Sequence, residues 1–85
     1  LMYLNPKKYN INSRALIKQS KPNHIIIVVD RKSRIIMKDG MRINEQKQAI
    51  NQVRPNTKVS LQTTAPICSK TKEYLLSKNI NIINS

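Results

Sequence analysis

The chain of 85 residues has room for one small domain, and its sixteen lysine and arginine residues against four acidic residues give a formal net charge of +12. A single cysteine excludes an internal disulfide, and the longest uninterrupted apolar run, Ile25–Val29, is far too short to span a membrane. With one histidine and four acids, the chain is poor in catalytic and metal-binding side chains. We therefore expect no catalytic site, no metal and no cofactor, and we expect an intracellular, cytoplasmic protein, because no secretory signal is present.

The hydrophobic core has to come from isoleucine. Thirteen residues are isoleucine, whereas phenylalanine and tryptophan are absent. β-Branched side chains pack well on a pleated sheet, and a single glycine with four prolines is few for a protein made only of hairpins. The composition predicts an α/β fold, divided into a basic N-terminal arm with a short helix (residues 1–22) and an α/β domain (residues 23–85).

The N-terminal arm begins with an irregular segment, residues 1–11, that mixes apolar and basic residues. Asn12 or Ser13 can cap a first helical turn with its side chain, which predicts a short helix over Arg14–Gln19. Pro22 ends this helix, because the residue before a proline is displaced from the α region.

The strongest strand signal is His24–Val29, with five β-branched residues in succession. A continuous apolar run of this length predicts a central strand that is buried on both faces. The polar tetrapeptide Asp30–Ser33 is typical of a turn, and Arg34–Met37 resumes the apolar pattern. We therefore expect residues 24–37 to form a hairpin, or one long strand followed by a short partner, with basic side chains at the tip, namely Arg31, Lys32 and Arg34.

A helix follows, capped by Asp39 or Asn44 and running to about Arg54. Its apolar positions are near the spacing of one helical face, and they are Ile43, Ala49, Ile50 and Val53. Lys58–Thr63 alternates apolar and polar residues, which predicts a half-exposed or edge strand.

A second helix is expected over Ile67–Lys78, with Asn79 in the left-handed conformation that closes a helix. A short strand, Ile80–Ile83, ends the chain. The predicted order is a short N-terminal helix and then β-β-α-β-α-β, with the helices packed on a mixed sheet.

The excess of positive charge favours a polyanionic partner, of which nucleic acid is the most common. The candidate phosphate contacts lie in the arm and at the hairpin tip, and they are Lys7, Lys8, Arg14, Lys18, Lys21, Arg31, Lys32 and Arg34. Tyr3 and Tyr9 can stack on unpaired bases. The alternative is that the basic surface is only solvated. The chain is rich in lysine, asparagine and isoleucine, as are proteins encoded by AT-rich genomes, so codon bias can account for the lysines.

The loop between the Lys58–Thr63 strand and the second helix is a candidate anion site. A helix start presents free N–H groups and a partial positive charge to an anion. Side chains with hydroxyl, thiol or amine groups surround it: Thr63, Thr64, Cys68, Ser69, Lys70 and Thr71. In the alternative interpretation, Thr64 or Ser69 only caps the helix.

At these residues the pattern T-x-P-x-C-x-K-T-K-x-x-L-L, set between two strands in residues 58–83, resembles the active-site segment of glutaredoxins. Cys68 falls on the second, resolving cysteine of that family, Pro66 falls on its proline, and Ile67 replaces its tyrosine. Ala65 stands where the family has its nucleophilic cysteine. The resemblance implies a degenerate glutaredoxin-like or thioredoxin-like domain.

A second segment, Val28-Val29-Asp30-Arg31-Lys32, resembles the acid-x-lysine element of restriction-like nucleases, in which the acid and the lysine hold a metal ion and a water. Those enzymes need a second acid upstream, and no acid precedes Asp30. Asp30 is therefore interpreted as a turn residue.

These patterns lead to a first hypothesis of a small, non-catalytic nucleic-acid-binding module that uses the arm and the hairpin tip, with no membrane association. The alternatives are a glutaredoxin-like or anion-binding domain that uses the 63–71 loop, or a basic subunit that docks onto a protein partner. The choice between RNA and DNA and the oligomeric state stay open.

Overall fold

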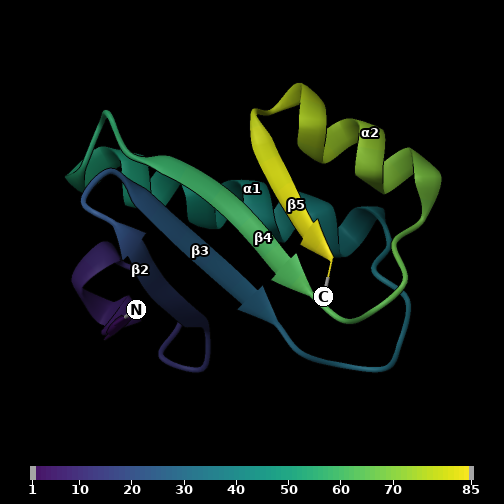
Figure 1. Cartoon of the computed structure of the whole chain (residues 1–85), viewed down its shortest axis with the longest axis horizontal. Helices are drawn as coiled ribbons and strands as arrows, with labels where there is room; N and C mark the ends of the chain where they lie inside the picture. The colour runs from purple at the N-terminus through teal and green to yellow at the C-terminus, as the bar shows by residue number, and fades with distance from the viewer. Residues whose placement is uncertain (1, 85) are drawn as a thin grey trace.

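The computed structural model describes residues 2–84. Its elements are, in chain order, β1 (Met2–Leu4), the 3-10 helix η1 (Pro6–Tyr9), β2 (Leu16–Lys21), β3 (His24–Val29), α1 (Met37–Val53), β4 (Lys58–Thr63), α2 (Ser69–Ser77) and β5 (Ile80–Asn84). The five strands form one sheet in the order β1-β2-β3-β4-β5 (Figure 1). The pairs β1–β2 and β2–β3 are antiparallel, whereas the pairs β3–β4 and β4–β5 are parallel. The predicted α/β class, with two helices on a mixed sheet, is confirmed.

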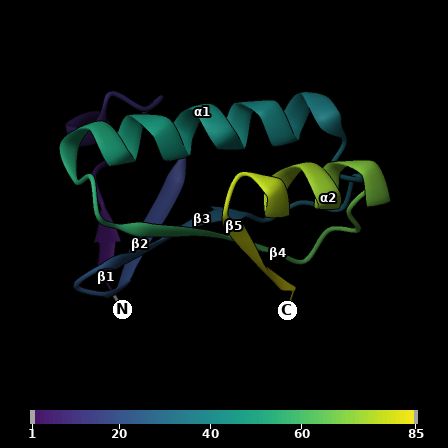
Figure 2. The same cartoon turned by 90° about the horizontal axis from the view of Figure 1, so that it is seen from above.

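Both helices lie on the same face of the sheet (Figure 2). One continuous core fills the space between the layers, and its fully buried side chains include Ile17, Ile27, Ile50, Leu61 and Leu75. Within residues 2–84, no element covers the opposite face of the sheet (Figure 1).

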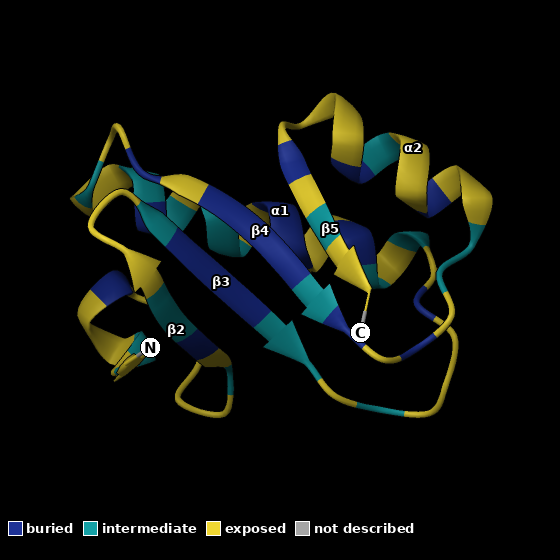
Figure 3. Cartoon of the chain, viewed as in Figure 1, coloured by how far each residue is buried: buried dark blue, intermediate teal, exposed yellow. Residues whose placement is uncertain are grey.

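Strand β3 is the central strand that its sequence predicts. Ile25 and Ile27 point to the helices and join the core. Ile26 points to the opposite face, yet only 5% of it is exposed. The run of β-branched residues therefore supplies buried side chains on both faces, as Figure 3 shows by the dark band along β3 and β4.

Helix α1 carries the expected apolar face only in part. Ile43 and Ile50 are buried in the core, and Ala49 packs against it, but Val53 is exposed because the helix ends there. The side chain of Asn51 closes this end, donating through Nδ2 to the carbonyl oxygens of Arg54 (3.3 Å) and Thr57 (3.0 Å).

The helix predicted over Arg14–Gln19 is wrong, because most of that segment belongs to β2. Six residues are too few for a helix to form without tertiary support. In the sheet, Ile17 pairs with Ile27 of β3 and is completely buried. Residues 2–21 thus supply two strands of the sheet as well as the buried side chains of Tyr9 and Ile11.

The hairpin predicted over residues 24–37 is also wrong. The hairpin partner of β3 is β2, and residues 30–36 connect β3 to α1. Ile35 ends this connection in the core, where its N–H donates to the Pro66 carbonyl (2.9 Å) and its carbonyl accepts from the Cys68 N–H (3.0 Å). These two bonds tie the loops before α1 and before α2 together.

Strand β4 is not an edge strand, because it lies between β3 and β5. Its alternating pattern comes from a face that is polar but buried: Ser60 is only 1% exposed. The end of α2 agrees with the prediction, since Asn79 adopts the left-handed conformation with φ of 60°.

The contact between the two helices generates a stability prediction. A Cβ atom added at Gly40 of α1 would lie 2.8 Å from Cγ2 of Thr71, a buried side chain of α2. Such overpacking costs about 1–3 kcal/mol, whereas replacing a helical glycine by alanine gains about 1 kcal/mol. We expect Gly40→Ala to lower the free energy of unfolding by about 1 kcal/mol in urea denaturation.

The matched background is Thr71→Ser, which removes the crowding methyl group and keeps the hydroxyl. In that background, Gly40→Ala should raise the free energy of unfolding by about 0.5–1 kcal/mol. An equal effect of Gly40→Ala in both backgrounds would contradict the close approach of the helices.

Candidate nucleic-acid interface

The face of the sheet opposite the helices is named here the uncovered face. The strand register arranges its side chains in three rows that cross the strands. The first row is Tyr3, Lys18, Ile26, Ser60 and Asn81; the second is Leu16, Val28, Gln62 and Ile83; the third is Lys21, His24 and Lys58.

One polar contact fixes the centre of the uncovered face. Nε2 of His24 lies 2.7 Å from Oγ of Ser60, across the β3–β4 pair. This hydrogen bond satisfies the serine hydroxyl, which is otherwise shielded from water. His24 is therefore a structural residue, and its ring also reaches the surface.

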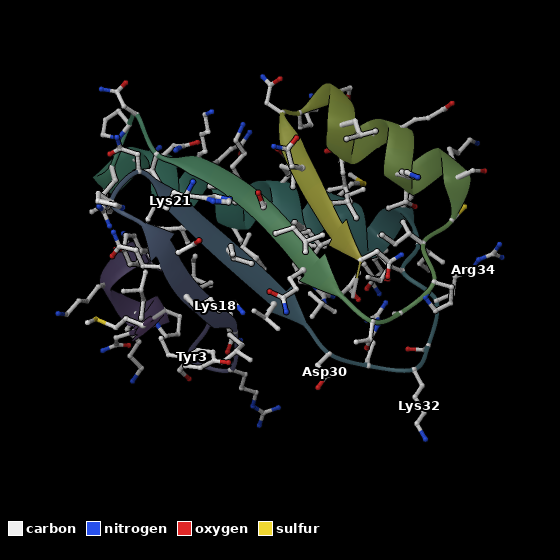
Figure 4. All side chains as sticks on the ribbon, viewed as in Figure 1. Tyr3, Lys18, Lys21, Asp30, Lys32 and Arg34 are labelled. Atoms are coloured by element: carbon white, nitrogen blue, oxygen red, sulfur yellow. The ribbon has the colours of Figure 1, made fainter. Side chains whose placement is uncertain are left out.

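The uncovered face is positively charged. Its three rows contain Lys18, Lys21 and Lys58 and no acidic residue, and Asp30 stands at its edge, just after β3. Figure 4 shows Tyr3 and Lys18 side by side on this face, with Lys21 further along β2. A hollow of about 230 Å³ lies beside them, between Leu16, Lys18 and Gln62 among others.

Tyr3 and Tyr9, the two tyrosines considered for base stacking, have opposite environments. Tyr3 is 63% exposed on β1, whereas Tyr9 is 7% exposed in the core. Stacking by Tyr9 is therefore a wrong prediction, since its ring already packs against the protein. Tyr3 keeps an aromatic surface free for a ligand.

The basic residues singled out from the sequence do not form one surface. Lys7 and Lys8 lie on η1, which packs beside α1, and Lys18 and Lys21 lie on the uncovered face. Lys32 and Arg34 stand on the β3–α1 connection, well away from Lys18 and Lys21 (Figure 4). Arg14 lies in the loop before β2 and lines a separate cleft.

Arg31 is occupied within the protein. Its Nη2 atom donates to Oδ2 of Asp39 (2.5 Å) and to the Arg34 carbonyl (3.1 Å), and its Nε atom donates to the Ser33 carbonyl (3.2 Å). Oδ2 of Asp39 also accepts the N–H of Ile36, just before α1. Arg31 thus shapes the β3–α1 connection, and its Nε and Nη2 donors are already used within the protein and not available to a phosphate.

The separate cleft measures about 350 Å³ and lies between the start of β2, the end of β3 and the first half of α1. It is lined by Arg14, Ala15, Leu16, Ile27, Val28, Val29, Asp30, Arg31, Asp39, Arg42, Ile43 and Gln46. Sequence reasoning missed Arg42 and Gln46, because only the packing of α1 shows which of its polar residues turn to β3. It also missed Lys58, which the register of β4 places on the uncovered face.

The cleft brings Asp30, the acid of the segment that resembles nucleases, together with Asp39. Asp39 is engaged by Arg31, and Asp30 accepts a hydrogen bond from Oγ1 of Thr64 (3.2 Å). Among residues 2–84, no group of three histidine, cysteine or acidic residues is arranged to hold a metal ion. The arrangement favours binding of an anion rather than metal-dependent hydrolysis.

The loop before α2 exposes fewer side chains to an anion than its sequence indicates. Thr63 and Thr71 are buried, and Oγ1 of Thr63 accepts the Ala65 N–H. Neither Thr64 nor Ser69 is the N-cap of α2, because Cys68 takes that place. Ser69 and Lys70 are exposed.

Cys68 makes no side-chain capping hydrogen bond, but it lies near the first N–H groups of α2. The backbone N–H groups of Lys70 and Thr71 lower the pKa of the Cys68 thiol from its usual value. The glutaredoxin-like interpretation stays a prediction, with Ala65 in the place of the nucleophile.

A scan of the chain against protein-family models found no match, and comparisons with curated proteins and with solved structures found no similar protein. Over residues 2–84, the helices are too short or too polar to cross a membrane.

The ion pair between Arg31 and Asp39 generates a pH prediction. The hydrogen bond from Arg31 is the main cause that lowers the pKa of Asp39 from its usual value. A carboxyl group whose pKa is lower in the folded state stabilises the fold above its unfolded pKa and loses that contribution as the pH falls through the folded pKa. We expect Asp39→Asn to lower the free energy of unfolding by about 1–2 kcal/mol at pH 7.

The measurement is urea denaturation of both proteins between pH 7 and pH 2. The difference between them should shrink as the pH falls below about 4. Glu45→Gln, at an exposed acid of the same helix, is the control and should change stability by less than about 0.5 kcal/mol. A difference for Asp39→Asn that stays constant over this pH range would contradict the ion pair.

Proposed function

We propose that the protein binds single-stranded nucleic acid, RNA or DNA, on the uncovered face of its sheet and performs no catalysis. The observation that carries the proposal is the composition of this face: lysines, an exposed tyrosine and apolar side chains in ordered rows, with no acid among them. The lysines match phosphate groups, and the tyrosine and the apolar side chains match unpaired bases.

Lysine side chains provide the phosphate contacts. Lys18 and Lys21 come from β2 and Lys58 comes from β4, on the two sides of β3, so a nucleic-acid strand that crosses the sheet can meet each of them. Lys7, Lys8, Lys32 and Arg34 lie off this face and add to the positive field that draws a polyanion towards the protein. Nucleic-acid binding through such contacts releases counterions and weakens with salt.

The remaining side chains of the uncovered face suit unpaired bases. Tyr3 offers an aromatic ring for stacking, and the second row offers the apolar side chains of Leu16, Val28 and Ile83. Gln62 and Asn81 supply donors and acceptors for base edges. A duplex hides its bases from such a flat surface, so the single-stranded form is favoured.

The first test measures fluorescence anisotropy of a labelled 12-nucleotide single strand. We expect binding at 50 mM salt, with an affinity that falls as the salt concentration rises. Lys18→Gln combined with Lys58→Gln should weaken binding about tenfold and reduce the salt slope by about 1.4, because each lost phosphate contact removes about 0.7.

The control removes the same charge from another face, by combining Lys70→Gln with Lys72→Gln on α2. It should weaken binding less than about threefold, through the long-range field alone. Equal losses in the two double variants would show that charge alone, and not this face, binds the strand. No binding at 50 mM salt by the unaltered protein would end the proposal.

Tyr3 can be tested in the same assay. Tyr3→Ala should weaken binding about tenfold, because stacking of one base contributes about 1–3 kcal/mol. Its salt slope should stay unchanged, since no phosphate contact is lost. Tyr3→Phe keeps the ring and should bind like the unaltered protein; an equal loss in both variants would contradict stacking.

A further inference from the structure

The cleft of about 350 Å³ next to the uncovered face has an arginine from each of two elements. Arg14 comes from the loop before β2, and Arg42 comes from α1. Among residues 2–84, neither guanidinium makes a hydrogen bond or an ion pair, whereas the neighbouring Arg31 is held by Asp39. Two unengaged guanidinium groups on one cleft match the oxygen atoms of a phosphate group.

The charge of the cleft favours a dianion. The ion pair of Arg31 with Asp39 cancels two of its charges, which leaves Arg14 and Arg42 against Asp30. A phosphate monoester carries a charge close to −2 at pH 7, whereas a phosphodiester within a strand carries −1. The monoester therefore gains more from the two arginines, and their two positive charges outnumber the single negative charge of Asp30 that repels it.

The cleft is continuous with the hollow on the uncovered face. Leu16, Val28 and Asp30 line both, so the two sites meet at the edge formed by the start of β2 and the end of β3. The floor of the cleft is made by Ile27 and Ile43, which are buried in the core. A nucleic-acid strand that passes around this edge therefore reaches the cleft and its two arginines.

We propose that this cleft binds the terminal phosphate of the nucleic-acid strand that lies on the uncovered face. This inference rests on the proposed function and adds a preference for phosphorylated strand ends. Arg14 and Arg42 hold the phosphate, and Gln46 donates a further hydrogen bond from α1. Asp30, kept in place by Oγ1 of Thr64, accepts a hydrogen bond from the 2′-hydroxyl of the terminal sugar when the strand is RNA.

The test uses one 12-nucleotide sequence with an internal fluorophore, prepared with a 5′-phosphate, with a 3′-phosphate, or with hydroxyl groups at both ends. We expect one of the two phosphorylated strands to bind about tenfold more tightly than the hydroxyl-ended strand. Arg14→Gln and Arg42→Gln should each reduce this preference to less than about twofold and leave the affinity for the hydroxyl-ended strand nearly unchanged. Arg34→Gln, at an exposed arginine outside the cleft, is the matched control and should keep the preference.

The outcomes separate the two proposals. Binding of all three strands with equal affinity would overturn the terminal-phosphate site and leave the proposed function intact. Binding of none of them at low salt would overturn both. Equal weakening of all three strands by Arg14→Gln would place a phosphate from within the strand in the cleft and overturn the inference.

A last arm distinguishes a strand end from a free nucleotide. A nucleoside 5′-monophosphate and a nucleoside 3′-monophosphate are titrated as competitors against the preferred strand. If either one binds as tightly as that strand, the cleft takes a free nucleotide and the strand-end inference fails. Competition only at concentrations at least about a hundredfold higher supports it, because the strand gains additional contacts on the uncovered face.

Discussion

The right-handedness of parallel crossovers determines the shape of this protein. Two parallel strands joined through a helix almost always connect in a right-handed sense. Because β3, β4 and β5 follow one another across the sheet in a single direction, both crossovers place their helices on the same face. Residues 2–84 form two α-helices, so within this part of the chain the other face of the sheet is open to water or to a partner. Its lysines, amides and single exposed tyrosine suit that position.

Two contacts join α1 to the sheet, one at each end of the strands. The Arg31–Asp39 pair fixes the link between β3 and α1 at one end of the sheet. At the other end, Nη2 of Arg54 donates to the Pro22 carbonyl (2.6 Å) and joins the end of α1 to the β2–β3 turn. The first contact also neutralises an acid of the cleft that Arg14 and Arg42 line.

Local patterns in the sequence predict most of the strands and helices after residue 23, although they also predict a hairpin over residues 24–37 and an edge position for β4, and both of these are wrong. His24–Val29 is a strand because of its β-branched run, and Asn79 closes a helix because asparagine tolerates the left-handed conformation. Leu16–Lys21 has no such pattern, and it becomes a strand only because β3 offers a pairing partner. Similarly, the sequence reveals an excess of positive charge, but the strand register places Lys18 and Lys58 on one face, and the packing of α1 brings Asp39 to Arg31. These arrangements depend on how separate elements pair and pack, and no local pattern in the sequence encodes them.

We propose that single-stranded nucleic acid binds on the uncovered face. The most direct measurement is a titration of the ¹⁵N-labelled protein with a 12-nucleotide single strand, followed by amide chemical-shift changes. The account predicts the largest changes along β1, β2 and β3 and at Gln62, and it predicts small changes along α2. Changes concentrated at the start of α2 around Cys68, with β2 and β3 unaffected, would contradict it.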